Sequence, residues 1–281
     1  MRKIVHMSDL HFGAVDEALL DPLERAIKGI GPDLIAVSGD LTQRARSREF
    51  IAARVFLDRF TVRQIVVPGN HDIPLYNVIR RFIDPLAKYS RYITEDLQPS
   101  FSDAVIAVVG INTARSLTIK DGRINEEQIE LARKQLGEMD GNVVKIVVTH
   151  HPFDLPEGSH ESDIVGRAEL AVKTLAACGA DLFLAGHMHT MHTGSTADRY
   201  QTPEHSALVV QAGSATSTRH RGEPNSFNLI HAGGSQIKVE RFVWHPDEGE
   251  FINTITEDFY RIGAVWMPGQ IMSPVHGHQN N

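Results

Sequence analysis

The sequence predicts a layered α/β fold in which two sheets lie between helices. Short apolar runs typical of buried strands alternate with amphipathic helical patterns over the first two thirds of the chain. The last third carries strand-like segments with turn signals and no helical pattern between them, which favours a second, partly antiparallel sheet. Several apolar runs also end in polar clusters, so the same pattern predicts where a site would lie.

Five apolar runs have the length and composition of buried strands. They are residues 3–7, 33–37, 63–67, 143–148 and 181–185. Polar residues follow each run at once, at positions 8–11, 38–40, 68–72, 149–152 and 186–189. Ligands of open α/β sheets bind at the carboxyl ends of strands, where the loops converge. We therefore expect the five clusters to meet at one edge of the sheets.

Two helical patterns between these runs are clear. Residues 126–139 place apolar side chains on one face and begin with a pair that resembles a capping box: Ile129, Ala132, Leu136 and Met139, after Asn125 and Gln128. Residues 167–178 do the same with Leu170, Thr174, Leu175 and Cys178, and Gly179 is placed as a C-cap.

The C-terminal part changes character. Residues 207–211, 226–230 and 236–243 are strand-like, and we place the end of the main domain at residue 243. Residues 244–281 then form a C-terminal extension, partly disordered at its end, with aromatic side chains at Phe251, Phe259, Tyr260 and Trp266. These aromatics fit either a homodimer contact or packing on the chain's own surface.

The composition is that of an ordinary acidic globular protein. The 281 residues are 42% hydrophobic and 22% charged, and a net charge of −7 disfavours stable nucleic-acid binding. The most apolar stretches, 104–110 and 143–148, are far shorter than the roughly 20 residues that cross a bilayer. The N-terminus also leaves no room for the apolar part of a signal peptide. We expect a cytoplasmic protein without a transmembrane segment, in which the single cysteine, Cys178, is a small core residue.

The polar clusters predict a metal site. Three carboxylate or amide oxygens and four imidazoles each stand directly after an apolar run: Asp9, Asp40 and Asn70, with His11, His150, His187 and His189. Each residue alone fits a turn, a helix cap or a hydrogen-bonded loop. Their joint occurrence favours metal ligation, and oxygen and nitrogen ligands without thiolate suit manganese, iron or zinc.

These motifs, in this order, resemble the calcineurin-like metallophosphoesterase family. They stand here as Asp9-Leu10-His11, Gly39-Asp40, Gly69-Asn70-His71-Asp72, His150 and Gly186-His187-Met188-His189. The resemblance implies a four-layer α-β-β-α sandwich of two mixed sheets, with a dinuclear metal site at the strand carboxyl ends and two divalent ions per chain. It implies that one ion is held by Asp9, His11, Asp40 and His189, and the other by Asp40, Asn70, His150 and His187. It makes His71 a catalytic residue outside the ligand set, which contacts the phosphate and helps protonate the leaving group, with Asp72 orienting or charging it.

Simple electrostatics agrees with this ligand set. Two cations about 3.5–4 Å apart repel, so an anion such as the Asp40 carboxylate is needed between them. The neutral Asn70 leaves the site with a net positive charge that suits an anionic phosphate. We therefore expect substitution of Asp40 to damage both metal positions.

The complete motif set and modest length resemble the small bacterial branch of the family. That branch includes class III cyclic nucleotide phosphodiesterases, glycerophosphodiesterases and phospholipase C-like enzymes, so the resemblance implies a small phosphodiester or a lipid headgroup as substrate. A phosphomonoesterase, a nuclease or a non-catalytic binding scaffold are the alternatives. Residues 153–165 and 190–206 are expected to select the substrate.

The remaining basic residues and histidines are weaker candidates. Cations at a helix start oppose the helix dipole, so the arginines after the Gly39-Asp40 loop fit either anionic substrate contacts or a solvated helix face: Arg44, Arg46 and Arg48. Arg115, Arg219 and Arg221 are further candidates for the rim. We interpret His151 as a loop residue and His192 as a surface residue, and we place His276 and His278 in a polar tail.

Overall fold

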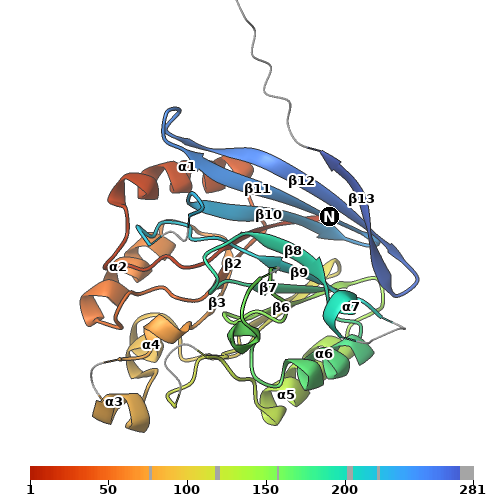
Figure 1. Cartoon of the computed structure of the whole chain (residues 1–281), viewed down its shortest axis with the longest axis horizontal. Helices are drawn as coiled ribbons and strands as arrows, with labels where there is room; N and C mark the ends of the chain where they lie inside the picture. Colours follow the sequence, from red (N-terminus) through yellow and green to blue (C-terminus); the bar gives the residue numbers. More distant parts are fainter. Residues whose placement is uncertain (76–77, 118–120, 157, 201–204, 220–221, 273–281) are drawn as a thin grey trace, which may run out of the picture.

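The computed structural model describes residues 1–75, 78–117, 121–156, 158–200, 205–219 and 222–272. A seven-stranded sheet and a six-stranded sheet pack face to face, and helices cover both outer faces (Figure 1). Each sheet contains parallel and antiparallel pairs. The predicted four-layer α-β-β-α sandwich of two mixed sheets is therefore confirmed.

The first sheet joins the two ends of the chain. Its order is β13 (Val265–Met272), β12 (Glu250–Ile262), β11 (Gln236–His245), β10 (Ser226–Gly233), β1 (Arg2–Met7), β2 (Leu34–Ser38) and β3 (Arg63–Val67). Strands β1, β2 and β3 are parallel, whereas β10 to β13 form antiparallel hairpins. Left-handed glycines, Gly234 at φ 61° and Gly263 at φ 65°, occupy the β10–β11 and β12–β13 turns.

The second sheet has a parallel centre and antiparallel edges. Its order is β4 (Ser100–Ser102), β5 (Ile106–Gly110), β6 (Val144–Val148), β7 (Leu182–Ala185), β9 (Leu208–Gln211) and β8 (His192–Ser195). Strands β5, β6, β7 and β9 run parallel, so their carboxyl ends lie at one edge. Strands β4 and β8 pair antiparallel at the two sides.

The helices form the two outer layers. Those of the first half of the chain are α1 (Leu20–Ile30), α2 (Ser47–Leu57), α3 (Val78–Ile83) and α4 (Ala87–Tyr92); those of the second are α5 (Glu126–Gly137), α6 (Ala168–Ala177) and α7 (Thr196–Arg199). Single 3-10 turns lie at Glu17–Leu19, Asn70–Asp72 and Glu161–Asp163. None of the helices that the structure describes has the length and apolarity to span a bilayer.

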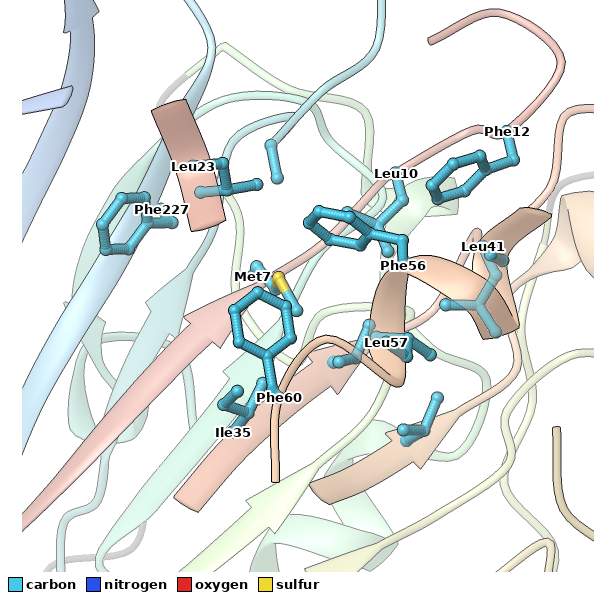
Figure 2. Close-up of a cluster of buried hydrophobic side chains, with 14 of the residues drawn as sticks. Met7, Leu10, Phe12, Leu23, Ile35, Leu41, Phe56, Leu57, Phe60 and Phe227 are labelled. Atoms are coloured by element: carbon cyan, nitrogen blue, oxygen red, sulfur yellow. The ribbon is translucent and has the colours of Figure 1, made fainter. Parts of the chain in front are cut away.

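Three buried clusters hold the four layers together. The first lies between α1, α2 and the first sheet and includes Met7 and Phe56 (Figure 2). The second lies between the sheets and includes Ile4 and Ile146, and the third lies under α5 and α6. Because alternate residues of a strand point to opposite faces, a strand buried on both faces reads as a continuous apolar run. This burial explains why these strands could be predicted.

The two predicted helices form, but one turns a different face to the core. Asn125 and Gln128 make the expected capping box, with Gln128 N donating to Asn125 Oδ1 at 2.8 Å. In α6 the prediction for Leu170 is wrong, since this side chain is 45% exposed. The buried face instead carries small residues that let the helix lie close to the sheet: Ala168, Ala171, Val172, Leu175 and Ala176.

The segment after residue 243 continues the first sheet. The strands β12 and β13 pair with β11 and with each other, and Phe251, Phe259 and Trp266 are buried in the chain's own core. Tyr260 is 46% exposed. The three buried aromatics therefore lend no support to a homodimer, which stays a prediction, as does the domain boundary at 243. The predicted tail histidines, His276 and His278, lie outside the described residues.

Candidate metal centre

The polar clusters that follow five strands meet at one edge of the sandwich. Asp9 and His11 follow β1, Asp40 follows β2, and Asn70 lies in the 3-10 turn after β3. His150 follows β6 of the opposite sheet, and the pair that follows β7 is His187 and His189. A continuous set of close contacts joins these seven side chains. The structure thus brings together every residue that the sequence predicted as a metal ligand.

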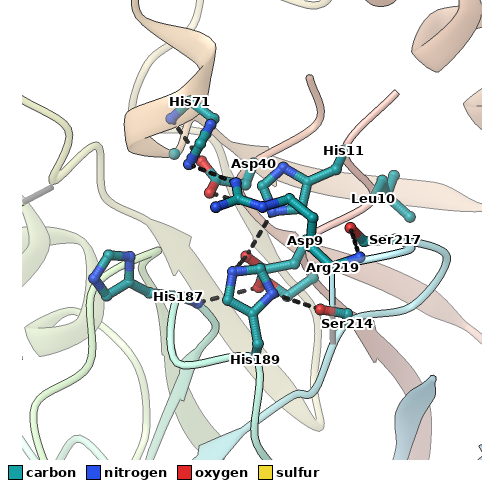
Figure 3. A network of polar contacts seen from close by, with 12 residues as sticks. Asp9, Leu10, His11, Asp40, His71, His187, His189, Ser214, Ser217 and Arg219 are labelled. Carbon is teal, nitrogen blue, oxygen red and sulfur yellow. Dashed lines mark hydrogen bonds and ion pairs between the residues drawn. The ribbon is translucent and has the colours of Figure 1, made fainter. Parts of the chain in front are cut away.

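One half of the cluster is centred on Asp9. Its Oδ1 lies 3.5 Å from His11 Nε2 and 3.6 Å from His189 Nε2. The rings of these two histidines stack with centroids 5.2 Å apart (Figure 3). Ligand atoms of the three residues lie within 4.8 Å of one another, a spacing at which all three can bind one ion.

The other half is centred on Asn70. Its Oδ1 lies 3.0 Å from His150 Nε2 and 3.1 Å from His187 Nδ1. Asp40 stands between the halves, because its Oδ2 lies 3.7 Å from His11 Nε2 and 3.4 Å from His150 Nε2. This carboxylate can therefore contact a cation in either half.

The backbone at these positions is unusual. Most of the seven residues have a left-handed conformation: Asp9 at φ 55°, His11 at 50°, Asp40 at 52°, His187 at 71° and His189 at 58°. A side chain in this region costs on the order of 1–3 kcal/mol and persists only where the surrounding structure fixes it. Such strain is typical of functional sites, and here it coincides with the predicted ligands.

The motif glycines make room for these ligands. A Cβ at Gly69 would meet the side chain and the backbone of Asp40, and one at Gly186 would meet Ser8 and Asp9. Any other residue at Gly69 or Gly186 would therefore displace a ligand. The motif requires glycine at these two positions because the backbone approaches a carboxylate closely.

Contacts around the cluster orient the imidazoles. His150 Nδ1 lies 2.8 Å from the Ser38 carbonyl, which can only accept, so Nδ1 carries the proton and Nε2 faces the site. His189 Nδ1 lies 2.6 Å from Ser214 Oγ, and its Nε2 likewise points to Asp9. Partners of this kind orient metal-bound histidines in general.

Unpaired buried atoms show that a cation fits here. Within the described part of the chain, Asp9 Oδ1 and His11 Nε2 are buried and make no hydrogen bond. A buried polar atom without a partner is costly, and a cation between these two atoms would remove that cost.

The charges of the cluster are those of a metal site. Burial by itself raises the pKa of Asp9, but the imidazoles of His189 and His11 outweigh it and hold this pKa below its ordinary value. The pKa of Asp40 is likewise held well below its ordinary value against burial, mainly by His150. Burial lowers the pKa of His187 to about 3, so this imidazole is neutral and can donate a lone pair. Burial lowers the pKa of His150, but the Asp40 carboxylate outweighs it and raises this pKa to about 9, so a cation bound here would take the place of that proton.

His71 stands beside the cluster, and its ring centroid lies 4.9 Å from that of His11. Its backbone N donates to Asp40 Oδ1 at 2.8 Å, and its ring Nδ1 donates to the Gln43 carbonyl at 2.9 Å. Its Nε2 lies 3.3 Å from Arg219 Nη1 (Figure 3). This arrangement fits the prediction that His71 is not a ligand.

Asp72 does not contact the His71 ring, contrary to expectation. Its carboxylate accepts from the backbone N of Gly69 at 2.9 Å and of Thr42 at 2.9 Å, and from Leu41 N at 3.2 Å. It is fully buried and ties the loop after β2 to the turn after β3. The orienting contact on the ring comes from Gln43 instead.

His151 lies in the loop after β6, as predicted, but its side chain packs against the predicted ligands His150 and His187. His151 is fully buried, its Nδ1 lies 2.8 Å from Thr113 Oγ1, and its ring centroid is 4.7 Å from that of His187. Nitrogens of His150, His151 and His187 lie within 4.8 Å of one another. Only the adjacency to His150 signalled this position, since sequence does not reveal which way a second ring points.

Of the other residues that the sequence suggested, some lie at the site and others make structural contacts elsewhere. Arg115 is bound to Gln128 Oε1 at 2.6 Å and to backbone carbonyls, so it braces the start of α5. His192 is half-buried beside Asp154 at 3.4 Å, away from the predicted ligands. Arg219 reaches over the cluster toward His71 (Figure 3). Arg221 lies outside the described residues, as do positions 201–204 of the predicted selectivity loop.

Comparisons with known proteins agree with this geometry. The chain is 23% identical over 171 residues to glycerophosphodiester phosphodiesterase GpdQ of Enterobacter lignolyticus. The aligned region covers 57% of this chain and 60% of that protein. It is 28% identical over 169 residues to a probable glycerophosphodiester phosphodiesterase GpdQ of Arcobacter nitrofigilis, with 58% of each covered. The chain thus matches about three fifths of the length of these curated relatives.

Solved structures share the fold. A purple acid phosphatase from yellow lupin superposes with a TM-score of 0.66 at 14% identity, over 90% of this chain and 52% of that chain. A dimetal phosphatase from Danio rerio superposes with a TM-score of 0.63 at 12% identity, over 85% and 95%. The family model described as calcineurin-like phosphoesterase matches residues 2–191, which include all seven predicted ligands. The chain therefore belongs to the calcineurin-like phosphoesterase family.

Proposed function

We propose that the chain is a phosphodiesterase that holds two divalent metal ions between the ends of its two sheets. The observation that carries the proposal is the position of Asp40, with Oδ2 at 3.7 Å from His11 Nε2 and 3.4 Å from His150 Nε2. A carboxylate placed in this way is the shared anion that two neighbouring cations need. Membership of the calcineurin-like family supports metal-dependent hydrolysis of a phosphate ester.

The ligands divide as the two halves of the cluster divide. Asp9, His11 and His189 would hold one ion, Asn70, His150 and His187 would hold the other, and Asp40 would contact both. When bound, the two ions supply Lewis acidity toward the phosphoryl oxygens and activate a water for attack on phosphorus. The oxygen and nitrogen ligands suit manganese, iron or zinc.

His71 has the placement of a proton donor. Its Nδ1 proton is held by the Gln43 carbonyl at 2.9 Å, so Nε2 is the atom that exchanges a proton with the substrate. Protonated at Nε2, it can give that proton to the oxygen that leaves phosphorus. Arg219, 3.3 Å from Nε2, stands where it can donate to the phosphate oxygens.

A phosphodiester is the proposed substrate. Both curated relatives carry the name glycerophosphodiester phosphodiesterase, which makes a glycerophosphodiester the first compound to test, before cyclic nucleotides and phospholipid headgroups. The phosphomonoesterase and nuclease alternatives share the same metal chemistry. A binding scaffold without catalysis would be expected to lack some of the motif residues. In this chain each ligand position and His71 carries the residue of the family motif.

The test is hydrolysis of a chromogenic phosphodiester beside the matching monoester. Protein stripped by a chelator is refilled separately with manganese, iron or zinc, and release of the phenolate is followed. We expect the diester to be cleaved only after refilling. Cleavage of the monoester alone would replace the diester by a monoester as substrate, and no cleavage by metal-loaded protein would favour the scaffold.

A further inference from the structure

A basic pocket lies beside His71, outside the ligand cluster. It has a volume of about 480 Å³, and its wall includes Gly13, Gln43, Arg44, Arg46, Glu49 and Arg219. These residues come from the loops after β1, before α2 and after β9, and Glu49 comes from the first turn of α2. The guanidinium groups of the neighbouring Arg44 and Arg46 therefore face the same small space as that of Arg219, which is far away in the sequence.

The pocket is continuous with the proposed reaction site. Arg219 Nη1 lies 3.3 Å from His71 Nε2 and 3.5 Å from Gln43 Oε1. Gln43 also accepts the His71 Nδ1 proton on its backbone carbonyl. The pocket thus begins on the side of His71, where the leaving group of the proposed reaction departs.

The loop that carries two of the arginines is held rigidly. Glu49 Oε2 accepts from Arg44 N at 2.8 Å and from Arg46 N at 3.3 Å. Thr42 Oγ1 accepts from Ala45 N at 3.2 Å, and Ala45 is left-handed at φ 50°. The backbone is therefore fixed while the guanidinium groups of Arg44 and Arg46 stay at the surface.

The pocket has a net positive charge. Glu49 is its one carboxylate, and that side chain is 3% exposed and already occupied by backbone N–H groups. Arg46 Nε lies 3.8 Å from Glu49 Oε1, too far for a strong hydrogen bond. Cations at the start of α2 also oppose its dipole, so a solvated face gains nothing from them. An anion in the pocket would balance the positive charge of the arginines and would interact favourably with the dipole of α2.

We propose that this pocket binds a second anionic group, a phosphate or a carboxylate, carried by the alcohol that leaves from the scissile phosphate. The inference rests on the proposed phosphodiesterase function and specifies its substrate class. Guanidinium groups bind such anions through paired N–H donors, and Arg219 would link the second anion to the reacting phosphate. The substrate would therefore carry two anionic groups at once.

The test uses two chromogenic diesters that differ only in charge. In methyl 3-carboxy-4-nitrophenyl phosphate the leaving phenol carries a carboxylate, and in the 3-carbamoyl analogue it carries a neutral amide of similar size. We expect kcat/KM of metal-loaded enzyme to favour the carboxylate by about tenfold or more, the effect of one charge-assisted hydrogen bond. Most of the difference should lie in KM.

Variants locate the effect in the pocket. Arg44→Gln combined with Arg46→Gln should reduce the preference for the carboxylate to near unity, by lowering kcat/KM for that substrate far more than for the amide. Arg48→Gln is the matched control, because Arg48 is an exposed arginine in the first turn of α2 that does not line the pocket. It should leave the preference unchanged.

A binding measurement separates the two proposals. Calorimetry with the free phenols, 5-hydroxy-2-nitrobenzoate and its amide, reads the pocket without turnover, and the carboxylate should bind more tightly except in the double variant. Hydrolysis of both diesters at equal kcat/KM, with equal binding of the phenols, would overturn the anion pocket and leave the phosphodiesterase standing. Selective binding without hydrolysis of either diester would support the pocket and overturn the proposed function.

Discussion

At the scale of single residues, Asp40 is the side chain on which both halves of the metal centre depend. We expect Asp40→Ala to lose both ions, because its Oδ2 faces His11 and His150 alike. His189→Ala should lose mainly one ion, since His189 faces Asp9 alone among the carboxylates of the cluster. Metal content by mass spectrometry checks this, and two ions retained by Asp40→Ala would contradict the bridging role.

His71 should separate catalysis from metal binding. His71→Ala removes the proposed proton donor and no ligand, so we expect full metal content and a kcat about 10²–10⁴-fold lower. His231→Gln is a control, because His231 lies in β10 beside Glu240, away from the cluster. Undiminished turnover in His71→Ala would overturn the assigned role.

The meeting of the seven proposed ligands could be predicted because each stands directly after an apolar run that the fold buries. Arg219 could be named only as one of several candidates for the rim, and His151 and Gln43 could not be assigned to the site in this way. Arg219 approaches His71 across 148 positions of sequence, and Gln43 acts through its backbone carbonyl, which any residue would supply. Contacts of this kind depend on how separate loops close on one another, and no local pattern encodes that.

At the scale of elements, the turn after β3 brings Asn70 and the Asp40 carboxylate together at a glycine. A methyl group at Gly69 would collide with Asp40, so Gly69→Ala should lower metal affinity and destabilise the fold by about 1–3 kcal/mol without removing a ligand. Gly141→Ala is the control, because a Cβ there meets nothing within 4 Å. Thermal unfolding and metal titration measure both, and equal behaviour of the two variants would refute the argument.

A second element, the loop after β6, is fastened to α7 by an ion pair. Asp154 Oδ1 accepts from Arg199 Nε at 2.8 Å. Burial opposes ionisation of Asp154, but His192 and Arg199 outweigh it and lower its pKa below the ordinary 3.8. Because the folded pKa lies below the unfolded one, this stabilisation is present above pH 3.8 and is lost as the pH falls through the folded pKa.

We therefore expect Asp154→Asn to lower the free energy of unfolding by about 1–3 kcal/mol at neutral pH and to flatten its acid dependence. Glu161→Gln is the matched control, because Glu161 binds the same arginine but its side chain is 76% exposed. Urea unfolding followed between pH 3 and 7 measures both variants. An unchanged acid slope in Asp154→Asn would show that other groups set it.

Most strands that are buried on both faces were predicted, whereas the half-buried strand β12 was not. The strands β1, β2, β3, β6 and β7 each contain an apolar run that packing between the layers buries. Strand β12 is 13 residues long, but most of its side chains are half-buried and many are polar, so no periodic apolar face marks it. The face of α6 was misjudged because alanines cover the sheet there, and alanine gives a weak periodic signal.

At the scale of the whole molecule, the metal centre joins the two sheets. Asp9, His11, Asp40 and Asn70 come from the first sheet, whereas His150, His187 and His189 come from the second. Metal that binds only the folded state should stabilise it by about 2.7 kcal/mol at a hundredfold excess over Kd, which raises Tm by roughly 5 °C or more. Scanning calorimetry of stripped and refilled protein checks this, and Asp40→Ala should show no such rise.

Properties of the assembled molecule beyond the fold stay predictions. The cytoplasmic location rests on the sequence. Three of the four aromatic side chains that suggested a homodimer are buried in the chain's own core, so they lend it no support. Size-exclusion chromatography with light scattering decides the assembly state directly. A monomer would leave the metal centre intact, because both sheets that supply its ligands belong to one chain.

Two of the hairpin turns in the first sheet lie at the end of the molecule opposite the proposed metal centre. In the register of β1 and β10, Arg2 faces Ala232 and His6 faces Asn228, so the Gly234 turn lies at the end opposite the metal ligands. The Gly263 turn lies at that same end, because Ile237 pairs with Phe259. A fluorescent label or a surface tether can therefore be attached at either turn and leave the mouth of the site open to substrate.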